Sequence, residues 1–334
     1  MVPAEVLAEA ITLLQERFRF LKKTEITLEV NPENVDEKNP AIWKKIGINR
    51  ISLGMQSFQP KDLRTLGRGH TVTQAINAYH SIRQAGFANV SGDLIAGLPR
   101  QTLRHWRENL EYLITLAPEH ISLYLLEVHE ETPLGARLSK GEMVLPPDNR
   151  VAAMYYAALE ICRQHGYEQY EISNWARPGF SSCHNRKYWE SAPVLGFGAG
   201  SHYSIGCRRF RNADSVGNYI KAVEENRSAA EEVAILDEGT WLSEYAIMAL
   251  RLRRGIHLGE FFRRYRFSFE DRYAEVIRRY AEWGLLEIHQ GCLRLTEPAL
   301  IVSNEIFQEF LHPGPDGSVD AGGGFGQKGK EISN

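Results

Sequence analysis

The chain has 334 residues, 43% of them hydrophobic, and a formal net charge of −3. This length predicts two domains, or one large domain with an appendage. The near-neutral charge gives no global reason to expect binding to nucleic acid or an anionic membrane. No run reaches the roughly 18 apolar residues that cross a bilayer, and residues 2–20 read as an amphipathic helix rather than a signal peptide. We therefore expect a cytoplasmic protein.

Apolar strands alternate with amphipathic helices along the first half of the chain. After the helix of residues 2–20, the pattern predicts helices at 40–46, 73–85, from Thr102 onward and at 149–165. It predicts strands at Ile26–Val30, Arg50–Gln56, Val90–Ala96, His120–Val128 and Tyr167–Asn174. The first four strands begin about 25 to 40 residues apart, which is the length of a βα crossover. A parallel α/β sheet or barrel follows from this rhythm.

Each of the first four strands has a polar residue at or near its carboxyl end. These residues are Glu29 with Asn31, then Gln56, Asp93 and Glu127. In parallel α/β sheets and barrels the carboxyl ends of the strands line the ligand cleft. We therefore expect these side chains to converge on one site.

The later part of the chain has a different character. Residues 175–212 are rich in Gly, Ser, aromatic residues and Arg with little periodicity, which is typical of a functional loop or capping segment. From about 238 to 311 the pattern is three helices and a hairpin around Gln290-Gly291, the order of a winged helix. The tail from Gly314 is Gly-rich and polar, which predicts disorder.

Four cysteines occur in the chain, and none forms a closely spaced pair. The shortest interval runs from 162 to 183, and the positions are Cys162, Cys183, Cys207 and Cys292. This spacing argues against a zinc site and against a cluster held by a compact cysteine motif. In a cytosolic chain they are most simply reduced thiols, most of them in the core.

The units align in order with a known family. Residues 1 to 311 resemble the radical S-adenosylmethionine (SAM) coproporphyrinogen III oxidase-like family through Glu29-Val-Asn-Pro, Ser52-Leu-Gly-Met-Gln-Ser-Phe, Gly92-Asp-Leu-Ile-Ala-Gly-Leu-Pro and Ser122-Leu-Tyr-Leu-Leu-Glu. The runs His184-Asn-Arg-Lys-Tyr-Trp and Gly196-Phe-Gly-Ala-Gly-Ser-His resemble its haem-chaperone subgroup rather than the true oxidase. Each motif is weak alone, but their number, order and spacing are specific.

The resemblance implies an α/β fold. A partial (βα)6 radical-SAM-type barrel missing its first two units is expected at 1–175 and a loop-rich extension at 176–237. A winged-helix-like α+β domain at 238–311 and a disordered tail at 312–334 follow. The three clustered cysteines that hold the family's [4Fe–4S] cluster are not in the sequence, nor is its Gly-Gly-Thr-Pro loop. As written, the chain is not expected to cleave SAM.

Two explanations compete for this departure. The chain is either a fragment of an ordinary family member or a shortened protein that has lost radical chemistry. A shortened barrel would expose an unpaired edge strand at Ile26–Val30, which is an aggregation liability. The fragment reading is therefore the favoured one.

The resemblance also implies SAM contacts for Glu29, Gln56, Arg68 and Asp93. The chemistry fits, because a carboxylate accepts hydrogen bonds from the ribose diol and an Arg fork clamps the amino-acid carboxylate. Other readings stay open. Gln56 also reads as a strand-end hydrogen bonder, Arg68 as a solvated loop residue, and Glu127 as part of a solvated acidic rim.

For haem, the resemblance implies a site at the run that contains His184, Asn185, Tyr188 and Trp189. Imidazole and thiolate are axial ligands of haem iron, and flat aromatic rings suit a porphyrin face. Cys183 and His202 are further candidates for the ligand. The alternative is that Tyr188 and Trp189 are core anchors, that His184 fixes the loop, and that Cys183 is a buried thiol.

Three functions follow. The first is a haem chaperone that passes haem to a client protein, with SAM and a [4Fe–4S] cluster in the complete protein. The second is an oxygen-independent coproporphyrinogen III oxidase. The third is nucleic-acid binding by a basic cluster of Arg251, Arg253, Arg254, Arg263, Arg264 and Arg266. Acidic residues interleave with this cluster, so we expect no nucleic-acid partner. No transmembrane segment is expected, while peripheral membrane association and the oligomeric state stay open.

Overall fold

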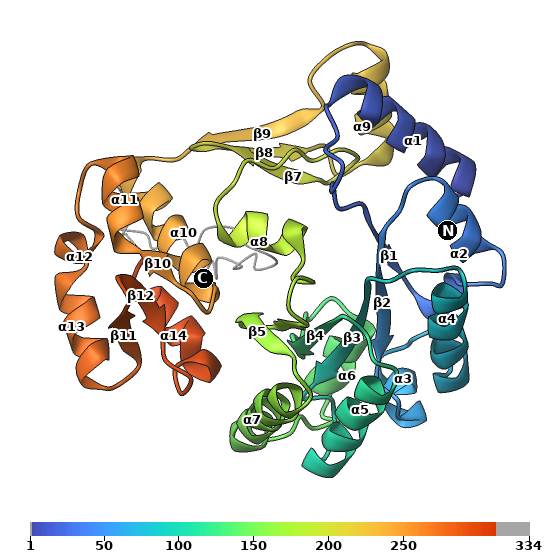
Figure 1. Ribbon diagram of the computed structural model, residues 1–334, viewed down its shortest axis with the longest axis horizontal. Helices are drawn as coiled ribbons and strands as arrows, with labels where there is room; N and C mark the ends of the chain where they lie inside the picture. Colours follow the sequence, from blue (N-terminus) through green and yellow to red (C-terminus); the bar gives the residue numbers. More distant parts are fainter. Residues whose placement is uncertain (1, 312–334) are drawn as a thin grey trace. The chain divides into compact units, whose positions relative to one another are not determined.

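The computed structural model describes residues 2–311, and it divides into two compact units (Figure 1). The first unit ends at Ser182 and the second begins at Cys183. The sequence places this boundary after residue 175. The predicted disordered tail at 312–334 lies outside the described residues.

The first unit is an α/β structure around one six-stranded sheet. Its elements are α1 (Ala4–Arg17), β1 (Thr27–Val30), the 3-10 helix η1 (Pro32–Asn34), α2 (Asn39–Lys45), β2 (Arg50–Gln56), α3 (Pro60–Thr65), α4 (Val72–Gln84), β3 (Val90–Ala96), α5 (Leu103–Thr115), β4 (His120–Leu125), α6 (Pro133–Ser139), α7 (Asp148–Gln164), β5 (Glu168–Glu171) and β6 (Asn174–Ala176). The strand order is β1-β2-β3-β4-β6-β5, and β1 to β4 pair in parallel. The predicted α/β class is confirmed.

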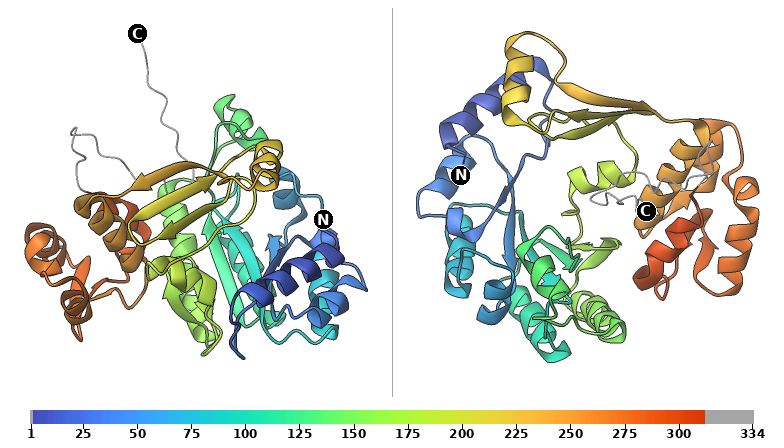
Figure 2. Two further views of the ribbon diagram at one scale, coloured as in Figure 1. Left: turned by 90° about the horizontal axis from the view of Figure 1, so that it is seen from above. Right: turned by 180° about the vertical axis from the view of Figure 1, so that it is seen from behind.

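The two faces of this sheet differ in chemistry because strand side chains alternate. Leu53 and Leu94 are fully buried on the outer face, where helices α4, α5 and α7 pack (Figures 1 and 2). Gly92 also belongs to this face: a Cβ there would lie 2.4 Å from Leu113 Cδ1 of α5, so only glycine lets the helix approach so closely. The opposite, inner face has polar side chains instead.

One predicted strand of this unit is wrong. The run Tyr167–Asn174 forms no single strand but most of a hairpin, in which β5 and β6 are antiparallel and β6 is antiparallel to β4. The turn is held by Glu171, whose carboxylate accepts from Ser173 N at 3.0 Å and from the side chain of Asn174. A hydrogen bond of this kind, between a side chain and the backbone, stabilises a turn. The hydrophobic pattern of these residues alone predicts a continuous strand.

The second unit contains a helix, an antiparallel sheet and a winged-helix order of elements. They are α8 (Cys183–Trp189), β7 (His202–Ile205), β8 (Arg208–Asn212), α9 (Val216–Glu224), β9 (Ala230–Ile235), α10 (Glu238–Arg251), β10 (Ile256–His257), α11 (Leu258–Tyr265), α12 (Phe269–Arg272), α13 (Ala274–Glu282), β11 (Leu286–His289), β12 (Cys292–Leu295), the 3-10 helix η2 (Leu300–Val302) and α14 (Ser303–Gln308). The two sheets have the orders β7-β8-β9 and β10-β12-β11.

Residues 176–237 contain more regular structure than the sequence predicts. Figure 2 shows β7, β8 and β9 as a twisted ribbon. In the chain this ribbon is followed by the helices from α10 onward, which form the winged-helix part of the unit. Tyr203 and Phe210 face each other across β7 and β8, with ring centroids 4.6 Å apart and planes 4° from parallel. Arginines fill the positions on both sides of Phe210 in β8, so this strand lacks the alternation of apolar and polar residues that predicts a strand. No helix among residues 2–311 is long and apolar enough to cross a membrane.

Candidate functional site

Polar side chains form a ladder across the inner face of the first unit's sheet. The register places Glu29 of β1 beside Ser52 of β2, and Asp93 of β3 beside Ser122 of β4. Because inward-facing positions recur at every second residue, each strand contributes several members. The ladder is made of Arg50, Ser52, Ser91, Asp93, His120, Ser122 and Tyr124.

Asp93 lies at the centre of this inner-face ladder. Ser52 Oγ donates to Asp93 Oδ2 at 2.9 Å, and Ser91 Oγ donates to Oδ1 at 2.9 Å. Burial raises the pKa of the Asp93 carboxyl, whereas the serine hydroxyls and the positive charge of Arg50 act in the opposite direction. Because these effects oppose each other, a hydrogen-bond donor or a charge added beside the carboxyl would shift the pKa of Asp93 further.

His120 extends the ladder toward β5. Its Nδ1 lies 2.8 Å from Ser91 Oγ and its Nε2 lies 2.9 Å from the hydroxyl of Tyr170. Burial, with a smaller contribution from the charge of Arg50, lowers the pKa of His120 well below 6.5. The imidazole is therefore neutral at physiological pH. Arg50 itself is only 4% exposed and its Nε has no hydrogen-bond partner among the described residues.

Glu29 and Asp93 face a common neighbour, Tyr124. Burial and then the negative charge of Asp93 raise the pKa of the Tyr124 hydroxyl to about 12, and Glu29 adds to the shift. Glu29 is exposed, in contrast to Asp93, which is half-buried. The two predicted ribose-binding carboxylates thus lie on the same face of the sheet, around one hydroxyl group.

A second group of predicted residues meets at the carboxyl ends of β1 and β2. Arg68 Nη1 lies 3.5 Å from Asn31 Oδ1. A Cβ on Gly54 would lie 2.8 Å from Gln56 Nε2 and 3.2 Å from Asn31 Oδ1, so both side chains converge above this glycine. Gln56 has a φ of 65°, a left-handed conformation that turns the chain sharply at the end of β2.

The loop that carries Arg68 is anchored by its other neighbours. His70 Nδ1 lies 3.0 Å from Glu33 Oε2, and its Nε2 lies 3.3 Å from the carbonyl oxygen of Met55. His70 is buried, so this pair ties the loop to η1 and to β2. Arg68 therefore projects from a held segment and not from a freely moving one.

Glu127 is the one strand-end candidate that the structure does not bring to either group. It is exposed in the segment after β4, and it makes no hydrogen bond or ion pair with any described residue. Conversely, Ser52, Ser91 and His120 were missed by the sequence interpretation. Their alternation with apolar residues in Arg50-Ile-Ser52 and His120-Ile-Ser122 was the available signal.

The predicted haem residues lie on the short helix α8, in the second unit. The rings of His184 and Tyr188 contact edge to face, with centroids 4.9 Å apart, one helical turn from each other. His184 is exposed. The guanidinium of Arg251 lies 4.4 Å from the ring centroid of Trp189, so Trp189 anchors α8 to α10. Its buried indole Nε1 has no hydrogen-bond partner within the described part of the chain.

The arginine cluster of this unit is largely occupied by contacts with the protein itself. Besides Arg251 on Trp189, Arg254 forms an ion pair with Glu190 at 3.2 Å. Arg253 donates to the carbonyl oxygen of Leu295, and Arg264 covers the ring of Tyr265. Of these contacts, the ion pair with Glu190 offsets the charge of Arg254, whereas the others orient the guanidinium groups and leave them charged.

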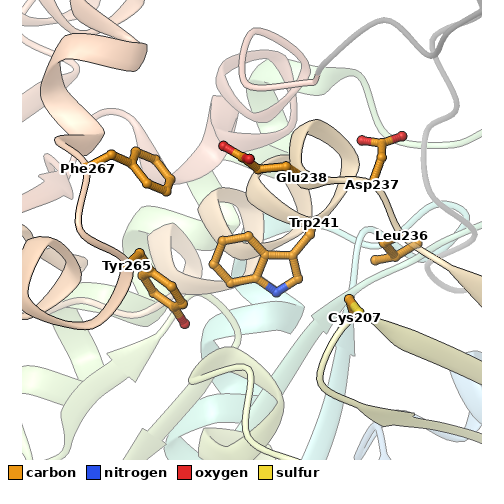
Figure 3. A pocket seen from close by; sticks show the side chains of 7 residues that line it. All are labelled: Cys207, Leu236, Asp237, Glu238, Trp241, Tyr265 and Phe267. Atoms are coloured by element: carbon orange, nitrogen blue, oxygen red, sulfur yellow. The ribbon is translucent and has the colours of Figure 1, made fainter.

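A hollow of about 330 Å³ lies at the start of α10, and Figure 3 shows the side chains that line it. It is lined by Cys207, Leu236, Asp237, Glu238, Trp241, Tyr265 and Phe267. Its charged lining consists of two carboxylates, which disfavours the anionic propionates of haem. Asp237 is also engaged in capping α10, since it accepts from Thr240 N at 2.7 Å. The hollow contains no predicted haem residue.

The described residues do not supply a site for an iron–sulfur cluster. No group of three or more His, Cys, Asp or Glu side chains in residues 2–311 is arranged to hold a metal ion. The four cysteines are all free thiols: Cys162 is buried, Cys183 and Cys207 are exposed, and Cys292 is half-buried. The expectation that most of the cysteines lie in the core is therefore wrong, and so is the interpretation of Cys183 as a buried thiol.

Comparisons with known proteins agree on one family. The model of the radical SAM superfamily matches residues 2–113, and the model of the HemN C-terminal domain matches residues 236–302. The chain is 33% identical to the haem chaperone HemW of Bacillus subtilis over 86% of this chain and 76% of that protein. It is 30% identical to HemW of Lactococcus lactis over 93% of this chain and 82% of that protein.

A solved structure gives the same fold. The coproporphyrinogen III oxidase HemN from Escherichia coli, described as a radical SAM enzyme, superposes with a TM-score of 0.77. The alignment covers 92% of this chain and 74% of that one, at 20% sequence identity. At this identity the likeness concerns the fold alone.

Proposed function

The chain belongs to the HemW subgroup of the HemN-like radical SAM family, and from this premise we propose that it binds haem and passes it to a client protein. The relationship to HemW over most of both chains carries this proposal. The family implies SAM and a [4Fe–4S] cluster as cofactors. The described residues suit SAM, whereas they offer no site for the cluster.

We propose that SAM binds at the inner-face ladder and at the group above Gly54, because both offer polar side chains that match its ribose and amino-acid parts. Glu29 and Asp93 would accept hydrogen bonds from the ribose hydroxyls, and Arg68 would pair with the amino-acid carboxylate. Gln56 would contribute its amide above Gly54, where the lack of a side chain leaves room for the amide. In the family, SAM and a reduced cluster together supply a carbon radical. The described residues offer no site for such a cluster.

Haem is the cargo in this proposal, and α8 is the proposed place for it. The exposed imidazole of His184 is the candidate axial ligand, with Tyr188 against its ring and Asn185 beside it. Trp189 would contribute by holding α8 in place through its contact with Arg251. His202 is the alternative ligand; it is exposed at the start of β7.

A transfer experiment tests the function. The chain is loaded with one equivalent of haem, freed of excess, and mixed with an apo-haemoprotein whose Soret band differs from that of the donor. We expect the acceptor spectrum to grow faster when the donor and acceptor contact each other than when they are separated by a dialysis membrane. Equal rates would mean that free haem, and not a chaperone, carries the cargo.

The oxidase remains the alternative function, but no described residue favours it over haem transfer. The likeness to the oxidase structure shows a common fold only. Decarboxylation of coproporphyrinogen III by a reconstituted sample would support it. A cytoplasmic location stays a prediction.

A further inference from the structure

A continuous hydrogen-bonded chain leads from Asp93 across three strands of the first unit. Asp93 Oδ1 lies 2.9 Å from Ser91 Oγ, which lies 2.8 Å from His120 Nδ1. His120 Nε2 then lies 2.9 Å from the hydroxyl of Tyr170 in β5. Ser91 and His120 have no exposed surface, whereas Tyr170 is half-buried.

The number of protons in this chain allows two arrangements. A serine hydroxyl has one proton, so Ser91 donates either to Asp93 or to His120, but not to both. If Asp93 is ionised, Ser91 donates to it and His120 carries its proton on Nδ1. If Asp93 is protonated, it donates to Ser91, Ser91 donates to Nδ1, and His120 carries its proton on Nε2.

We propose that Ser91, His120 and Tyr170 form a proton relay that couples the protonation state of Asp93 to the tautomer of His120. These three are positioning residues, because they act on a ligand only through Asp93. The evidence for this coupling is the row of hydrogen-bond contacts from Asp93 to Tyr170. Its use in SAM binding rests on the proposed function.

The transfer balances without any further reactant. The proton of Asp93 passes to Ser91 Oγ as the Ser91 proton passes to His120 Nδ1. His120 then gives the proton of Nε2 to the oxygen of Tyr170, whose own proton leaves to water. One proton has left, Asp93 is an anion, and His120 is a neutral imidazole of the other tautomer.

The surrounding charges permit this exchange. Arg50 of β2 stabilises the anionic form of Asp93 and also disfavours a charged His120. Glu29 of β1 and Glu171 of β5 both act on Tyr124 of β4, which itself faces Asp93. Burial holds the His120 imidazole neutral, and a neutral imidazole has the one donor and one acceptor that a relay requires.

The expected benefit lies in ligand binding. A ribose diol donates hydrogen bonds, so it favours the ionised carboxylate, whereas burial favours the protonated acid in the free protein. The relay provides an exit for the proton through Ser91 and His120 to the half-buried hydroxyl of Tyr170. SAM binding should therefore release a proton at pH values below the pKa of Asp93 in the free protein.

The first test reads the tautomer of His120 from its ring ¹⁵N chemical shifts, with His120→Asn used to assign the signals. As the pH is raised from the ordinary Asp pKa of about 3.9, we expect the wild type to change tautomer when Asp93 loses its proton. Asp93→Asn should show one tautomer throughout. Ser91→Ala should abolish the change, whereas Ser52→Ala, which also removes one hydrogen bond to Asp93, should keep it. A tautomer that is constant in the wild type, or that still switches in Ser91→Ala, overturns the relay.

The second test measures protons released on SAM binding by calorimetry in buffers of different ionisation enthalpy. We expect release that approaches one proton per SAM at the acidic end of the range and that disappears in Asp93→Asn. Binding of SAM without release at any pH would overturn the role of the relay in binding. A chain that fails to bind SAM while its His120 tautomer still follows Asp93 would support the relay and contradict the proposed SAM site.

Discussion

The hydroxyl of Ser52 in β2 lies 2.9 Å from Asp93 Oδ2 in β3, so one strand holds the carboxyl that its neighbour presents. This bond joins two residues that are 41 positions apart. It makes the inner face of the sheet a single polar unit, in which the charge of Asp93 is set by residues of several strands.

Asp93→Asn should change how stability depends on pH. Because burial raises the pKa of Asp93, the folded state binds its proton more tightly than the unfolded state does. The resulting stability is fully present below the ordinary Asp pKa of about 3.9 and is lost as pH rises through the raised value. Denaturant unfolding at a series of pH values should show this loss in the wild type but not in Asp93→Asn. A variant curve parallel to the wild type would contradict the raised pKa.

His120 should give a pH dependence of the opposite sign. Its pKa is lowered by burial, so it contributes stability above the unfolded value of about 6.5 that is lost as pH falls. His120→Asn should therefore lose less stability than the wild type on acidification below that pH. The same unfolding titrations measure it, and an unchanged acid limb would show that His120 is protonated in the fold.

Gly54→Ala should weaken SAM binding by about tenfold, the cost of one displaced hydrogen bond. The added methyl would lie 2.8 Å from Gln56 Nε2 and would push that amide away from the cleft. Equilibrium dialysis with labelled SAM measures the affinity. Gly217→Ala is the control, because a Cβ there approaches nothing more closely than 3.9 Å. Equal affinities of both variants would exclude the proposed position of Gln56.

Arg68→Lys should also weaken SAM binding by about tenfold or more, although it keeps the charge. A guanidinium makes two parallel hydrogen bonds to a carboxylate, which an ammonium cannot reproduce. The loop should stay in place, because His70 and Glu33 hold it independently. An affinity restored to the wild-type value by lysine would show that Arg68 acts only as a point charge.

Gly255→Ala should destabilise the winged-helix part of the second unit by several kcal/mol. A Cβ there would lie 2.0 Å from the carbonyl oxygen of Leu293, at a φ of +69°. Gly284 has nearly the same φ, +70°, but nothing within 4 Å, so Gly284→Ala should cost only the backbone term of about 1–2 kcal/mol. Thermal unfolding of the two variants separates the clash from the backbone strain. Equal losses would mean that β12 moves aside without cost.

Much of the first unit was predictable from local pattern. The bounds of β2 and β3 match the structure residue for residue, because both strands alternate with helices whose caps are visible in the sequence. Thr102 caps α5 by accepting from His105 N, as its position before an amphipathic run predicts. Glu29, Gln56 and Asp93 stand at or near strand ends in the sequence, whereas the family resemblance alone indicated Arg68, in the loop between α3 and α4. The structure groups Glu29 with Asp93 and Gln56 with Arg68.

Other features depend on contacts that a single sequence does not reveal. The β5–β6 hairpin follows from the carboxylate of Glu171, which binds its own turn. The role of His120 follows from its register beside Ser91 of β3. Trp189 reads equally as a porphyrin contact or an anchor until Arg251 is found against its ring. In each case the deciding partner is a polar group, for which hydrophobic periodicity carries no information.

Haem binding at α8 is tested by a haem titration of the wild type and of His184→Ala. We predict one haem per wild-type chain, with a Soret band distinct from free haem, and at least a tenfold weaker affinity in His184→Ala. His202→Ala, titrated alongside, should match the wild type. Unchanged binding in His184→Ala together with loss in His202→Ala would move the ligand to β7. Failure of the wild type to bind haem in stoichiometric amount would contradict the account.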